Sequence, residues 1–118
     1  IADSAGRSVA VEYVDNEMIV TETAVLTNFY LAEGEKQWIG SEQSYERYDI
    51  LMNRLEESPR MGMDDVRDAL DRVSKDNFGE ADSTEWSIVM NLSTGEMRYY
   101  HRENYDRSYT FFLQPDPA

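Results

Sequence analysis

Residues 86–100 read Trp-Ser-Ile-Val-Met-Asn-Leu-Ser-Thr-Gly-Glu-Met-Arg-Tyr-Tyr, and this stretch decides the expected fold class. Apolar side chains recur at every second position from Trp86 to Leu92, and the alternation resumes over Glu96–Arg102. A period of two residues is typical of a β-strand, whose side chains point alternately to the two faces of a sheet. Because turn-forming residues separate the two runs, the stretch predicts an antiparallel hairpin, with a third strand over Ser108–Leu113.

The N-terminal part of the chain shows the same two-residue period. It predicts one strand over Ser8–Val14 and a second over Glu17–Thr21, joined by a turn at Asp15-Asn16. A further short strand is predicted over Ala24–Thr27, which places Asn28 at the end of a strand. The first third of the chain is therefore expected to be mainly β-structure.

Between the two β regions the period changes to that of a helix. The polar segment 31–43 is predicted as a loop, and Ser44 is expected to cap a helix that runs to about Glu57. A second amphipathic helix is predicted over Met63–Lys75. This order of elements predicts an α+β fold, in which two helices pack on one side of an antiparallel β-sheet within a single domain over residues 1–118.

Composition excludes several classes of function. A net charge of −13 opposes binding to nucleic-acid phosphates, and no apolar run is long enough for a membrane helix. Cysteine is absent, so these residues contain no disulfide, thiolate metal site or cysteine nucleophile. With one histidine, His101, and scattered carboxylates, neither a metal site nor a cofactor is expected. The compartment, cytoplasmic or secreted, is left open.

Asn28 and Arg47 are the candidate catalytic residues. An asparagine amide that points into a cleft is a neutral, directional donor to an oxyanion, although Asn28 could instead bond to its own backbone. Arg47 lies near the start of a predicted helix, where the helix dipole does not favour a cation. It is expected to hold a carboxylate or an active-site thiolate, unless it forms a surface pair with Glu42 or Glu46.

Four stretches of the sequence match the motifs of one enzyme family. In that family the motifs read D-x-x-G-x-[SA]-x-x-[IV]-E, [VL]-x-T-N, S-x-x-R-[FY] and T-x-[WY]-[ST]-x-V. Here they read Ile-Ala-Asp-Ser-Ala-Gly-Arg-Ser-Val-Ala-Val-Glu-Tyr (1–13), Val-Leu-Thr-Asn-Phe (25–29), Ser-Tyr-Glu-Arg-Tyr (44–48) and Thr-Glu-Trp-Ser-Ile-Val (84–89). In this order and spacing, the chain resembles the linear amide C–N hydrolases of the N-terminal-nucleophile (Ntn) superfamily, the choloylglycine hydrolase family with its penicillin V acylase and acyltransferase relatives.

The resemblance implies an αββα sandwich, of which this chain supplies the C-terminal portion and the N-terminal part of the same enzyme is the partner. It implies a cysteine nucleophile upstream of Ile1, whose own α-amino group is the base. Asn28 matches the asparagine that completes the oxyanion hole, and Arg47 matches the arginine that organises the electrostatics of the site. The implied reaction is cofactor-free hydrolysis of linear, non-peptide amides, such as bile salts or other N-acyl amides.

The residues after Asn28 bear on the substrate. Phe29 and Tyr30 replace the proline-containing segment of bile salt hydrolases and resemble the acyltransferase and acylethanolamine-amidase side of the group. Phe29, Tyr30 and Trp38 are candidate walls of an acyl pocket, or else buried aromatics that hold the loop down. The alternatives for the whole chain are a non-catalytic scaffold or binding domain and an acyltransferase. Half a sandwich would expose an apolar sheet face, so self-association into a homo-oligomer is expected.

Overall fold

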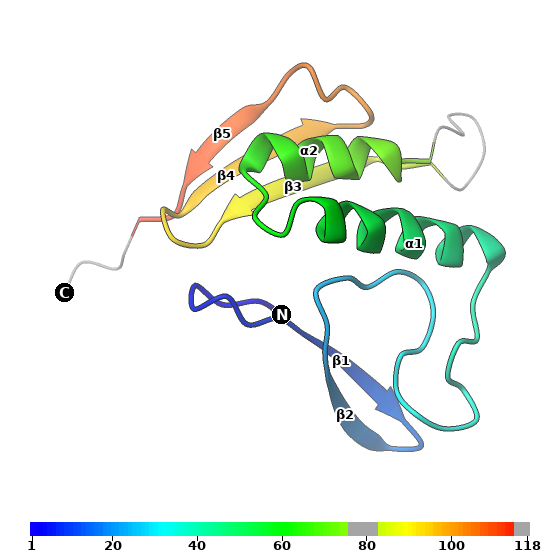
Figure 1. The fold of residues 1–118 in the computed structure, drawn as a ribbon. Helices are drawn as coiled ribbons and strands as arrows, with labels where there is room; N and C mark the ends of the chain where they lie inside the picture. The colour runs from blue at the N-terminus through cyan, green and yellow to red at the C-terminus, as the bar shows by residue number, and fades with distance from the viewer. Residues whose placement is uncertain (76–82, 115–118) are drawn as a thin grey trace. The chain divides into compact units, whose positions relative to one another are not determined.

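The computed structural model describes residues 1–75 and 83–114, and within them the fold is α+β, as predicted (Figure 1). The strands form two antiparallel sheets. The chain divides into two compact units, Ile1–Asn53 and Arg54–Ala118, so that the single domain stays a prediction. The elements in chain order are β1 (Val9–Val14), β2 (Glu17–Glu22), α1 (Glu42–Glu57), α2 (Met63–Arg72), β3 (Trp86–Asn91), β4 (Glu96–His101) and β5 (Tyr109–Phe112).

The first unit is built on the hairpin of β1 and β2, in which Val9 pairs with Glu22 and Val14 pairs with Glu17. The turn residues Asp15 and Asn16 have φ angles of 52° and 64°. These are left-handed conformations, which the short polar side chains of aspartate and asparagine tolerate and which a tight hairpin requires. The predicted pair of strands and its turn are therefore confirmed.

Residues 24–27 do not form the strand that the sequence predicted. The Thr23 hydroxyl donates to the Val25 carbonyl (2.8 Å) and accepts from the Val25 N–H (3.2 Å). These bonds occupy backbone groups that a neighbouring strand would need. The segment is therefore an irregular connection, and Asn28 lies in a loop instead of at a strand end.

Helix α1 begins three residues earlier than predicted, because Ser41 caps it in place of Ser44. The Ser41 hydroxyl accepts the backbone N–H of Ser44 (3.2 Å), as an N-cap side chain does. Ser44 lies inside the first turn and is only 1% exposed. The second helix, α2, ends at Arg72, three residues before the predicted Lys75. Both helices exist as predicted, with shifted ends.

In the second unit, β3, β4 and β5 form the predicted meander, with β4 in the centre. Helix α2 packs on one face of this sheet, beside β3 (Figure 1). The core between them consists of Val89, Tyr100 and Tyr105, with Met63, Val66 and Leu70 packed against it. The strands thus form two sheets where the sequence predicted one, because the β1-β2 hairpin pairs only with itself in the described residues. Helix α2 packs beside β3, and the packing of both helices on one side of a sheet stays a prediction.

A buried hydroxyl pair fixes this core, and it yields a first prediction. The Tyr105 hydroxyl hydrogen-bonds to the Ser87 hydroxyl (3.0 Å) and also contacts the Ser74 hydroxyl. Ser87 is buried, so Tyr105→Phe should leave it without this partner and lower the free energy of unfolding by about 1–3 kcal/mol. Urea denaturation measures this loss. Tyr109→Phe, at an exposed position, is the matched control, and an equal effect of the two changes would contradict the prediction.

Candidate functional site

Asn28 and Arg47, the two residues that the sequence singled out, are hydrogen-bonded to each other. Arg47, on α1, donates from Nη2 to Asn28 Oδ1 at 2.8 Å. A guanidinium has no acceptor, so the oxygen of the Asn28 amide must face it and the NH₂ group must face away. Asn28 is exposed, and Arg47 is partly buried. The pair therefore presents a fixed amide donor at the surface of the first unit.

A small hydroxyl network holds this pair in place. Arg47 Nη2 also lies 3.3 Å from the Ser44 hydroxyl, which is 2.8 Å from the Ser41 hydroxyl. The Thr27 hydroxyl donates to the Ser44 carbonyl at 2.8 Å. The residue before Asn28 is thereby tied to the first turn of α1. Within the described residues, Arg47 makes these bonds in place of the surface ion pair with Glu42 or Glu46.

The backbone on the other side of Asn28 is packed against Gly40. Phe29 and Gly40 form an isolated antiparallel bridge. A Cβ atom built on Gly40 would lie 2.5 Å from Phe29 Cβ and 2.7 Å from the Asn28 carbonyl oxygen. The close approach requires glycine for reasons of space, since Gly40 has no left-handed φ angle. In the sequence, Gly40 is distinguished only as part of the polar segment 31–43, which was predicted as a loop.

The three candidate pocket aromatics differ in exposure. Phe29 is 6% exposed and is enclosed by Trp38, Tyr45 and Tyr48, with ring centroids 5.1–5.3 Å apart. It is a core residue of the first unit. Trp38 is 51% exposed and Tyr30 is 36% exposed, so both retain ring surface for a ligand. Their role as pocket walls stays a prediction.

Glu12 lies near this site and is the final Glu of the motif in residues 1–13, but it was not predicted as a site residue. It lies on β1, and its carboxylate accepts the backbone N–H groups of Leu31 and Ala32, each at 2.8 Å. A signal was present in the sequence, because Glu12 falls between Ala10 and Val14 on alternate positions of one strand. Those two neighbours are buried, which puts a charged residue on the inward face of the hairpin.

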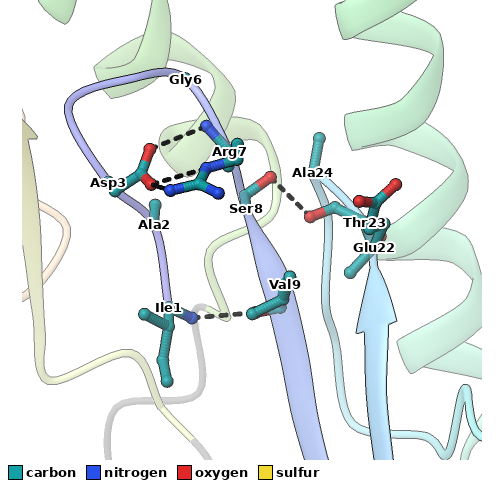
Figure 2. Close-up of a pocket in the computed structure, with 10 residues that line it drawn as sticks. All are labelled: Ile1, Ala2, Asp3, Gly6, Arg7, Ser8, Val9, Glu22, Thr23 and Ala24. Carbon is teal, nitrogen blue, oxygen red and sulfur yellow. Dashed lines mark hydrogen bonds and ion pairs between the residues drawn. The ribbon is translucent and has the colours of Figure 1, made fainter.

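A cavity of about 540 Å³ lies at the open end of the hairpin, away from the predicted site residues (Figure 2). Figure 2 shows the Asp3 carboxylate accepting from the Arg7 backbone and guanidinium. The hydrogen bond from the Arg7 backbone lowers the pKa of Asp3 below its ordinary value. These groups already satisfy each other. The lining consists of Ile1, Ala2, Asp3, Gly6, Arg7, Ser8, Val9, Glu22, Thr23 and Ala24.

The other features considered from the sequence are His101, metal-ligand clusters and membrane-spanning helices. His101 is exposed at the end of β4, with its Nδ1 3.3 Å from the Tyr99 hydroxyl. No group of three or more potential metal ligands occurs in residues 1–75 and 83–114. Neither of the described helices is long and apolar enough to cross a membrane.

Comparison with known proteins gives no match for this chain among protein-family models, curated proteins or solved structures. The choice of a family is accordingly a proposal, which stands on the four sequence motifs and on the geometry around Asn28.

Proposed function

We propose that residues 1–118 form the C-terminal portion of a cysteine Ntn hydrolase that cleaves linear, non-peptide C–N amide bonds; the longer chain is called the parent enzyme below. The observation that carries the proposal is the hydrogen bond from Arg47 to Asn28 Oδ1. It joins two residues that lie 19 positions apart in the sequence and that the family motifs select independently.

The geometry suits oxyanion stabilisation. Because Arg47 occupies the amide oxygen of Asn28, the Nδ2–H groups face away from it and can donate to a substrate. The positive guanidinium also polarises the amide, which strengthens donation from the nitrogen. An oxyanion at Nδ2 would lie near a fixed cation without touching it. Asn28 is thus the proposed catalytic donor, and Arg47 is the proposed positioning residue.

In the proposed reaction, the thiolate of the N-terminal cysteine of the parent enzyme attacks the amide carbonyl carbon. The carbonyl oxygen becomes an oxyanion, which accepts a hydrogen bond from Asn28 Nδ2. As the tetrahedral intermediate collapses, the C–N bond breaks and the amine leaves with the proton that the α-amino group had taken from the thiol. Water then cleaves the thioester and releases the carboxylic acid. No cofactor enters these steps.

The second unit supports the proposed αββα sandwich. The face of its sheet opposite α2 carries mostly apolar side chains in register: Ile88 lies beside Tyr99 and Tyr109, Met90 lies beside Met97 and Phe111, and Trp86 lies beside the polar His101. Trp86, Met90, Tyr109 and Phe111 are 44–61% exposed. A helix on one face and an uncovered apolar surface on the other is what one half of a sandwich presents to a second sheet.

This surface predicts that the isolated chain self-associates. Apolar faces of this kind are normally covered, and a second copy of the chain offers a matching face. Sedimentation velocity should show species heavier than the monomer as concentration rises. Met90→Glu, at an exposed position of this face on β3, should weaken association by about tenfold or more, while Ser93→Glu in the nearby turn should not. A monomer at all concentrations would argue that the chain is a self-sufficient domain.

The experiment that tests the function traps the covalent intermediate. The parent enzyme is mixed with N-acyl amides of different chain length, quenched in acid and analysed by mass spectrometry. We expect one acyl group on its N-terminal cysteine and an early burst of free amine. The absence of both with every substrate would overturn the enzyme proposal in favour of a binding or scaffold domain. An added second primary amine separates the two enzyme classes, since an acyltransferase would pass the acyl group to that amine and form a new amide, whereas a hydrolase would release the free acid.

A further inference from the structure

Glu12 is a charged residue placed where the hairpin otherwise buries apolar side chains. It lies on β1 between Ala10, which is 2% exposed, and Val14, which is 7% exposed, and the three side chains share one face of the strand. Placing a carboxylate on such a face costs free energy unless hydrogen bonds replace its water. Glu12 itself is partly buried, so hydrogen bonds from the protein can stabilise its carboxylate there.

The structure supplies those hydrogen bonds from the segment that follows Asn28. Leu31 N–H donates to Glu12 Oε1 and Ala32 N–H donates to Glu12 Oε2, both at 2.8 Å. Hydrogen bonds to a charged acceptor are shorter and stronger than those between neutral groups. One carboxylate thus anchors two successive backbone amides, and Ala32 itself is buried.

The segment 28–32 is consequently held at both ends. Thr27 and Asn28 are tied to α1, while Leu31 and Ala32 are tied to Glu12. Between Asn28 and Leu31, the nearest residues of the two anchors, the chain spans about 10 Å at most. A shift of the second anchor therefore acts on residues 29 and 30, which directly follow Asn28.

We propose that Glu12 is a positioning residue for the catalytic amide: its carboxylate fixes the segment after Asn28 and so sets where the Asn28 donor lies. Its catalytic consequence rests on the proposed function, whereas its hold on the segment does not. Tyr30, with its partly exposed ring, lies between the two anchors and is positioned by the same contact.

Glu12→Gln in the parent enzyme tests this proposal, because glutamine has the same shape but only one acceptor oxygen. Its amide NH₂ must oppose one of the two backbone N–H groups. We expect the amide protons of Leu31 and Ala32 to exchange with solvent about ten- to a hundredfold faster. We also expect kcat per titrated active site to fall about ten- to a hundredfold, with KM within about twofold. Glu17→Gln, an exposed change of the same charge on β2, is the control and should leave all three values unchanged.

The outcomes separate this proposal from the proposed function. Unchanged amide exchange at Leu31 and Ala32 in Glu12→Gln would overturn the positioning role. If Asn28→Ala lowers kcat, then faster exchange in Glu12→Gln together with a wild-type kcat would overturn it as well. If Asn28→Ala leaves kcat unchanged, Asn28 is not the catalytic donor, and kcat no longer reports on its position. The side-chain amide resonances of Asn28 then decide on Glu12: a shift in the Glu12→Gln spectrum supports the positioning role, and an unaltered spectrum overturns it.

Discussion

Replacing Asn28 with alanine is expected to lower the kcat of the parent enzyme on N-acyl amides by about a hundredfold to a thousandfold, with little change in KM. The Nδ2 donor meets a full negative charge only when the carbonyl carbon has become tetrahedral. Its loss therefore raises the energy of the transition state and barely affects substrate binding. Steady-state kinetics on an amide with a chromogenic amine measures both constants.

Two companion variants separate the donor from the fold. Asn28→Asp keeps an oxygen for Arg47 but places a carboxylate oxygen where the donor was, so it should be at least as slow as Asn28→Ala. Asn53→Ala removes an exposed amide from α1 and should retain the wild-type kcat. A wild-type kcat for Asn28→Ala would remove Asn28 from the mechanism.

Gly40→Ala is the second change with a large expected effect, at a residue that touches no substrate in the proposed mechanism. We expect kcat to fall about a hundredfold and the free energy of unfolding to fall by about 1–3 kcal/mol. The new methyl group would lie 2.7 Å from the Asn28 carbonyl oxygen and 2.5 Å from Phe29 Cβ. Phe29 is enclosed by aromatic rings, so the backbone at Asn28 must move. Kinetics and urea denaturation of the same preparation measure the two effects.

Gly62→Ala is the matched control for this change. A Cβ on Gly62 would have its nearest neighbour, an Asp65 carboxylate oxygen, at 3.6 Å. Its kcat should equal that of the wild type, and its cost in stability should stay below about 1 kcal/mol. If Gly40→Ala behaves like Gly62→Ala in kcat, catalysis does not depend on the backbone position that Gly40 sets.

The sequence predicted those elements whose pattern is local. The hairpin of β1 and β2 was predicted correctly because two local signals indicate the same structure. These are the two-residue period of the side chains and the turn residues Asp15-Asn16, and each depends only on neighbouring residues. The strand at 24–27 was predicted wrongly, because one hydroxyl, that of Thr23, takes up the backbone groups of Val25. The predicted start of α1 was wrong because Ser41 and Ser44 are both residues that can cap a helix. In the structure Ser41 is the cap, and Ser44 is buried inside the first turn.

The candidate site shows the same limit. Asn28 and Arg47 were selected from motifs, and the structure brings them within hydrogen-bonding distance. The supports of this pair were not predictable, because they depend on contacts between distant segments. Glu12 meets Leu31 only through the fold, and the need for glycine at position 40 arises from a backbone 11 residues earlier in the chain.

The rate of acyl-enzyme formation in a single turnover, compared between the wild type and Asn28→Ala, tests the central claim most directly. Alkylation of the nucleophilic cysteine by iodoacetamide is measured alongside, because it reports thiolate reactivity and requires no oxyanion hole. If Asn28 stabilises the oxyanion, acylation should slow by about a hundredfold to a thousandfold while alkylation proceeds at the wild-type rate. An unchanged acylation rate, or a parallel fall in both rates, would contradict that role.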